Sequence, residues 1–60
     1  MKTLRIGNVG ARLDDVGGLW VIDTIWAADD MVEIFDISDK TRTEPDTIAA
    51  ADFWVLLDKF

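Results

Sequence analysis

Residues 19–26 constrain the fold of this chain more than any other segment. They are rich in β-branched and aromatic side chains and follow Gly17-Gly18, which is typical of a strand introduced by a turn. Alternate positions place Trp20, Ile22 and Trp26 on one face, and the opposite face is also mainly apolar. A half-exposed antiparallel strand alternates between apolar and polar residues. This strand therefore needs cover on both faces, from a barrel wall, a C-terminal helix or a second subunit.

The segments around it predict further strands. Residues 3–6 alternate between polar and apolar side chains and suit a short first strand. Residues 7–18 contain four glycines, which we interpret as turn glycines in a loop-rich stretch. Residues 27–30 form a hairpin loop, residues 31–37 a returning strand, and residues 38–40 the next turn.

The last third of the chain allows two readings. In the first, residues 42–49 form a strand, residues 50–52 a single 3₁₀ turn and residues 54–57 a closing strand. In the second, an amphipathic helix begins at about residue 45, with Thr43 as its N-cap, and packs on a three- or four-stranded antiparallel sheet in an α+β fold. The helix would place Ile48 and Val55 opposite its apolar stripe, which favours the all-β reading.

The order of these segments resembles that of SH3-like small barrels. The resemblance is carried by residues 4–9 (LRIGNV), by Gly17-Gly18 before a long strand and hairpin, and by residues 51–57 (ADFWVLL). Asn8 stands where the family usually has Asp. The resemblance implies a five-stranded barrel, but it implies no function, because small barrels bind proteins, peptides and nucleic acids alike.

The absence of cysteine means that apolar burial alone must hold this chain together. Sixty residues make one small acidic domain, residues 1–60, and a chain of this length buries only roughly 60% of its unfolded surface. Its core must therefore be dense. The strand phases predict a buried core consisting of Ile6, Val21, Ile22, Ile25, Ile34 and Leu56.

The residue types argue against an enzyme. Without His or Cys, the nucleophile and base pairs of common hydrolases are missing, and the single serine, Ser38, suits a turn. Asp36, Asp39, Glu44 and Asp46 do not follow the spacing of a calcium loop. The glycines do not match a phosphate-binding loop or a dinucleotide fingerprint. We expect no catalytic residue, no bound metal and no cofactor.

The charge points instead to a basic partner. Twelve carboxylates against six basic residues give a formal charge of −6, which argues against direct nucleic-acid or anionic-membrane binding. Size and charge resemble those of small acidic phage-encoded inhibitors, anti-CRISPR proteins among them. We expect a non-catalytic inhibitor, a partial DNA mimic, that occupies the basic groove of a nucleic-acid-binding protein. The candidate partner-binding carboxylates are Asp14, Asp15, Asp29, Asp30, Asp36, Asp39, Glu44 and Asp46.

Two further expectations concern where these groups lie and whether the chain self-associates. A meander of strands would gather Asp14, Asp15 and Asp39 at one end of the sheet, and Asp29, Asp30, Asp46 and Asp52 at the other. The apolar face of residues 19–26 predicts a homodimer through Trp20, Trp26 and Met31. The alternative functions are an assembly domain that acts by homo-oligomerisation and a small nucleic-acid-binding barrel. With no apolar run of the roughly 20 residues that cross a bilayer, we expect a cytoplasmic protein.

Overall fold

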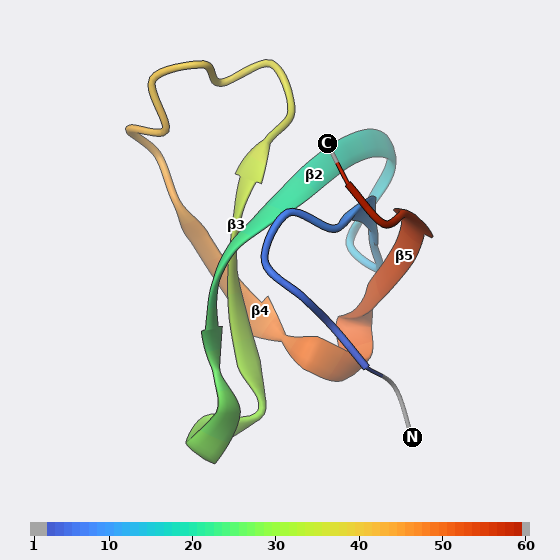
Figure 1. The fold of residues 1–60 in the computed structure, drawn as a ribbon. Helices are drawn as coiled ribbons and strands as arrows, with labels where there is room; N and C mark the ends of the chain where they lie inside the picture. The colour runs from blue at the N-terminus through green and yellow to red at the C-terminus, as the bar shows by residue number, and fades with distance from the viewer. Residues whose placement is uncertain (1–2, 60) are drawn as a thin grey trace.

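Five antiparallel strands form a single sheet in the computed structural model, which describes residues 3–59 (Figure 1). The elements are β1 (Val9–Arg12), β2 (Asp15–Trp26), the 3₁₀ turn η1 (Ala27–Asp29), β3 (Met31–Asp36), β4 (Asp46–Ala49), the 3₁₀ turn η2 (Ala50–Asp52) and β5 (Phe53–Leu57). The strand order is β4-β3-β2-β1-β5. The predicted all-β fold with five strands is confirmed. The sheet is not closed, so it is a barrel only in a loose sense.

The C-terminal third follows the strand prediction, except that β4 begins at Asp46 and not at residue 42, and the alternative helix from residue 45 is wrong. β4 and β5 are joined by η2, which occupies the three residues predicted for a 3₁₀ turn. Ile48 on β4 and Phe53 on β5 are both buried in the same apolar cluster. A helix would have turned Ile48 away from its apolar stripe, so burial of Ile48 favours the extended backbone.

The first strand lies later in the chain than predicted. Residues 3–6 are outside the sheet, and β1 instead begins at Val9 and includes Gly10. A Cβ atom on Gly10 would lie 1.7 Å from the carbonyl oxygen of Trp54, so β5 approaches β1 there only because residue 10 is glycine. Gly10 is therefore a strand glycine at a close backbone contact, not a turn glycine.

β2 is interrupted by two irregularities in its pairing. The first irregularity is at residues 16–19. Gly10 is opposite Trp20 and Arg12 is opposite Asp15, so these four residues of β2 correspond to Ala11 alone on β1. The second irregularity is at Asp23, because Ile22 is opposite Ile34 while Thr24 is opposite Glu33. An extra residue reverses the alternation of side chains along the strand. The side chains before Asp23 and those after it therefore alternate out of step, so that two residues an odd number of positions apart across Asp23 point to the same face.

This reversal corrects the predicted faces of β2. Ile22 and Ile25 both pack in the inner cluster, although simple alternation would separate them. Trp20 also packs on the inner face, but Trp26 is paired with Met31 on the outer face. The prediction that Trp20 and Trp26 share a face is wrong.

The sheet buries apolar residues on both of its faces, as the pattern of β2 requires. The inner cluster consists of Ile22, Val32, Ile34, Ile48 and Phe53. A smaller outer cluster consists of Val9, Val21 and Phe35, with Ile37 packed against it. The loop between β3 and β4 reaches this outer cluster, because the Arg42 guanidinium lies 5.8 Å from the centre of the Phe35 ring and bonds to Asp23 on β2 at 2.6 Å.

The predicted core is partly confirmed. Val21, Ile22 and Ile34 are buried, and Ile25 is half-buried against the inner cluster. Ile6 and Leu56 are 66% and 60% exposed, so their predicted burial is wrong. Ile6 lies in the turn before β1 and not in a strand. Leu56 is an extra residue in β5, because Val55 is opposite Gly10 and Leu57 is opposite Val9.

Candidate functional site

Two of the candidate carboxylates are held by the protein's own buried arginine. Nε and Nη2 of Arg12 donate to Asp14 at 2.6 and 3.0 Å, and Nη1 donates to Asp46. Arg12 is only 8% exposed, and its guanidinium lies 4.8 Å from the centre of the Trp20 ring. Asp46 therefore lies with Asp14 and not in the predicted group with Asp29 and Asp30. The reason is that Asp46 is opposite Ile34 on the inner face, where Arg12 crosses the sheet.

The contact between Arg12 and Asp14 shifts the pKa values of both groups. The hydrogen bond from Arg12 lowers the pKa of Asp14 below its usual value. The hydrogen bond to Asp14 raises the pKa of Arg12, against the opposing effect of burial. A buried guanidinium bonded to carboxylates, with an aromatic ring beside it, is a structural contact that leaves Asp14 and Asp46 less available to a partner.

Asp36 and Asp39 order the loop between β3 and β4. Asp36 Oδ1 accepts hydrogen bonds from the backbone N–H and the hydroxyl of Ser38, at 2.8 and 2.6 Å, and these bonds lower the pKa of Asp36. Asp39 accepts from the backbone N–H of Arg42 at 3.1 Å and of Glu44 at 3.3 Å. Desolvation acts to raise the pKa of Asp39, but its hydrogen bonds outweigh this and lower it. Both carboxylates thus have a local structural role.

The other four candidate carboxylates are exposed. Within residues 3–59, the side chains of Asp15, Asp29, Asp30 and Glu44 make no ion pair, and none of them accepts a side-chain hydrogen bond. Asp29 and Asp30 are neighbours in the turn between β2 and β3, and Asp30 adopts a left-handed backbone with φ of 55°. Of the eight candidate carboxylates, these four are the ones whose side chains are not engaged by other described residues.

Only two of the three residues predicted for self-association, Trp26 and Met31, lie together. Trp20 is half-buried beneath Arg12, and its indole Nε1 is buried with no acceptor among the described residues. Trp26 is 48% exposed and faces Met31 across the β2–β3 pair. The homodimer stays a prediction, but the continuous face of Trp20, Trp26 and Met31 on which it was based does not exist.

The hairpin tip, defined here as Trp26, Asp29, Asp30 and Met31, brings together residues from both predicted sets. Figure 1 shows that the β2–β3 turn lies at the opposite end of β3 from the β3–β4 loop. The backbone N–H of Ala50 donates to the Asp30 carbonyl at 2.9 Å and so anchors the turn to η2. A hollow of about 180 Å³ lies beside the tip, lined by Leu4, Ile25, Trp26, Ala27, Asp30, Met31, Val32 and Ala50.

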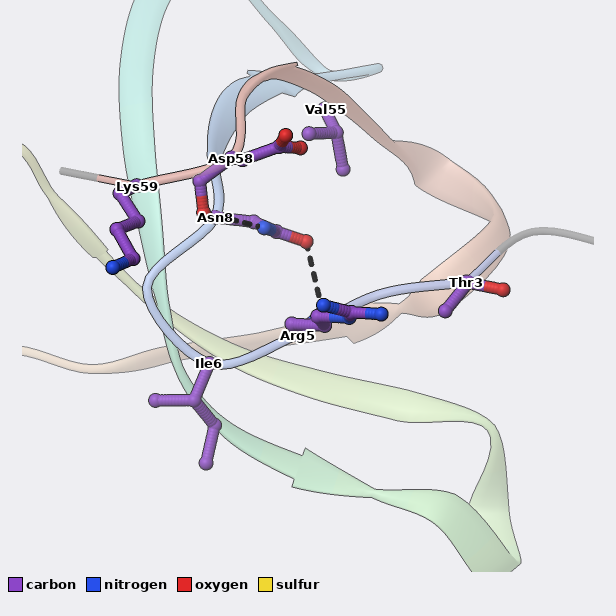
Figure 2. Close-up of a pocket in the computed structure, with 7 residues that line it drawn as sticks. All are labelled: Thr3, Arg5, Ile6, Asn8, Val55, Asp58 and Lys59. Atoms are coloured by element: carbon purple, nitrogen blue, oxygen red, sulfur yellow. Dashed lines mark hydrogen bonds between the residues drawn. The ribbon is translucent and has the colours of Figure 1, made fainter.

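A larger hollow, of about 530 Å³, lies between the N-terminal segment and the end of β5 (Figure 2). The buried side chain of Asn8 holds its walls together by accepting from the backbone N–H of Arg5 at 2.8 Å and donating to the Asp58 carbonyl at 2.9 Å. Lys59 also lines it. This hollow was not predicted, because Asn8 and Asp58, which join its two walls, are 50 residues apart in the chain.

Among residues 3–59, no group of three or more carboxylates is placed to hold a metal ion. In the same part of the chain, no helix is long and apolar enough to cross a membrane. The predictions of no catalytic residue, no bound metal and no cofactor stay predictions.

Comparison with known proteins adds no relationship to this description. No family model, curated protein or solved structure matches the chain. The resemblances to SH3-like barrels and to small acidic phage-encoded inhibitors therefore stay predictions.

Proposed function

We propose that this chain is a non-catalytic acidic module that binds a basic protein surface, and that the surface is a groove which otherwise holds nucleic acid. The observation that supports the proposal is which charged side chains form ion pairs within the protein and which do not. Among the described residues, Arg12 and Arg42 are bonded to the protein's own carboxylates, and the exposed cations without an ion pair are Arg5, Lys40 and Lys59. The carboxylates without an ion pair are more numerous and include Asp15, Asp29, Asp30 and Glu44. The outward-facing charge is therefore dominated by carboxylates.

Charge of one sign on a small body favours association with a surface of the opposite sign. It raises the rate of encounter and makes binding sensitive to salt. The molecule is 28 Å long, and a DNA duplex of that length carries roughly 16 phosphate charges. A net charge of −6 is much smaller. Mimicry of DNA is thus partial, and the affinity must also depend on non-ionic contacts.

The first experiment is affinity capture from a host lysate at low and at high salt, followed by competition with duplex DNA and with RNA. We expect a captured nucleic-acid-binding protein that is released by salt and displaced by its own nucleic acid. A partner whose affinity is unchanged by salt, or a ternary complex with nucleic acid still bound, contradicts the proposal.

The matched variant is the double reversal Asp29→Lys with Asp30→Lys. Neither side chain has an ion-pair partner in the described chain, so the reversal is expected to slow association with the captured protein and to leave the melting temperature nearly unchanged. The neutral double variant Asp29→Asn with Asp30→Asn should give an intermediate rate. Equal association rates for all three proteins would refute an electrostatic mode of binding.

A further inference from the structure

The fold twice places an arginine against an aromatic ring and fixes it with a carboxylate. Arg12 lies 4.8 Å from the centre of the Trp20 ring and is bonded to Asp14. Arg42 lies 5.8 Å from the centre of the Phe35 ring and is bonded to Asp23. In each case the cation faces a ring and a carboxylate together, which is a favourable setting for a guanidinium.

The hairpin tip has the same two components without an arginine. Trp26 is 48% exposed, and Asp29 and Asp30 follow it within the turn. Among the described residues, neither carboxylate has an ion pair and no arginine lies over the Trp26 ring. The Arg42 loop covers Phe35, at the other end of β3, and leaves the tip open.

We propose that the hairpin tip binds an arginine side chain of the basic partner, with the guanidinium against Trp26 and the carboxylates of Asp29 and Asp30. This inference rests on the proposed function and names the contact through which it acts. The hollow beside the tip, about 180 Å³, is below the roughly 300–1,000 Å³ of small-molecule sites, and its size suits a single side chain. Met31 and Ile25 supply apolar contact for the methylene stem.

Arginine is favoured over lysine for two reasons. Its planar guanidinium stacks on an indole ring and can bond to two oxygens at once. An ammonium group is more strongly hydrated and loses more when it leaves water. Arginine is also the side chain most used for phosphate recognition, so a groove that holds nucleic acid presents it on its surface.

The test uses an oligoarginine peptide and an oligolysine peptide of equal length, titrated at low salt into the ¹⁵N-labelled full chain. We expect oligoarginine to bind more tightly, with the largest chemical-shift changes at residues 25–32. Trp26→Ala should weaken oligoarginine binding by about tenfold and remove the preference for arginine. Trp54→Ala is the matched control, because Trp54 is also 48% exposed but lies on β5, away from the tip. Trp26→Phe keeps a ring and should retain most of the affinity.

The outcomes separate this inference from the proposed function. Two outcomes would overturn the hairpin tip as the arginine site and leave the proposed function standing. In the first, both peptides bind but the chemical-shift changes are centred on another group of carboxylates. In the second, the Trp26 and Trp54 variants change the affinity equally. Failure of both peptides to bind at low salt overturns both. If sedimentation equilibrium shows a dimer that Trp26→Ala converts to a monomer, while peptide affinity is unchanged, the occupant of the tip is a second copy and the inference is wrong.

Discussion

The Arg12 guanidinium on β1 is bonded to the Asp46 carboxylate on β4, although β2 and β3 lie between these strands in the sheet. The contact is made across the inner face, and it is possible only because the sheet curves strongly. Arg12 also holds Asp14 in the β1–β2 turn. One buried cation thus links three segments of a sheet that is not closed by strand pairing.

Loss of Asp46 is expected to destabilise the fold. Asp46→Asn leaves the buried Arg12 guanidinium with Asp14 as its only carboxylate, and we expect a cost of about 1–2 kcal/mol. Asp23→Asn removes the Asp23–Arg42 pair, which is exposed on both sides, and should cost less than about 1 kcal/mol. Urea unfolding of both variants measures the difference. Equal losses of unfolding free energy in the two variants would mean that the ion pair of Arg12 contributes no more to stability than that of Arg42.

Gly10→Ala is expected to prevent folding or to cost more than about 4 kcal/mol, because the new methyl group would meet backbone and not a movable side chain. The matched control is Gly17→Ala, which has open space around it and carries only the strain of a positive φ, about 1–2 kcal/mol. Thermal melts followed by circular dichroism compare them. A Gly10→Ala protein that melts close to wild type would show that β5 does not approach β1 as described.

Acid is expected to weaken the fold through Asp36. Hydrogen bonds from Ser38 lower the pKa of Asp36 in the folded state below the unfolded value of about 3.9. A group with a lowered folded pKa stabilises the protein above its unfolded pKa, and this contribution disappears as the pH falls through the folded pKa. The stability gap between wild type and Asp36→Asn should therefore be constant near neutral pH and shrink below about pH 4. A gap that widens in acid would contradict the assigned sign.

The inner core is expected to depend on Ile22 far more than on Leu56. Ile22 is fully buried, and Ile22→Ala should cost about 2–5 kcal/mol, which is much of the stability of so small a domain. Leu56 is 60% exposed, so Leu56→Ala should cost less than about 1 kcal/mol. Denaturant midpoints for the two variants test this assignment. A larger loss of stability for Leu56→Ala than for Ile22→Ala would mean that Leu56 is buried, as simple alternation along β5 predicts.

The sequence by itself determined the class of fold and much of its order. Both faces of residues 19–26 are apolar, and this correctly required cover on both faces of β2. The 3₁₀ turn at residues 50–52 and the strand that follows it were predictable because Ile48 and Val55 do not fit the apolar stripe of a helix. The exposure of Asp29 and Asp30 also followed from their place in a turn.

Only the tertiary structure decided which residues share a face of the sheet and which carboxylates are bonded to the protein's own arginines. The extra residue at Asp23 separates Trp20 from Trp26, and the extra residue at Leu56 exposes a predicted core side chain. Such irregularities arise from the fit between neighbouring strands, and strict alternation along one strand carries no sign of them. Arg12 likewise meets Asp46 across 34 residues of chain, so the sequence could count the charges but could not show which ones the curved sheet pairs.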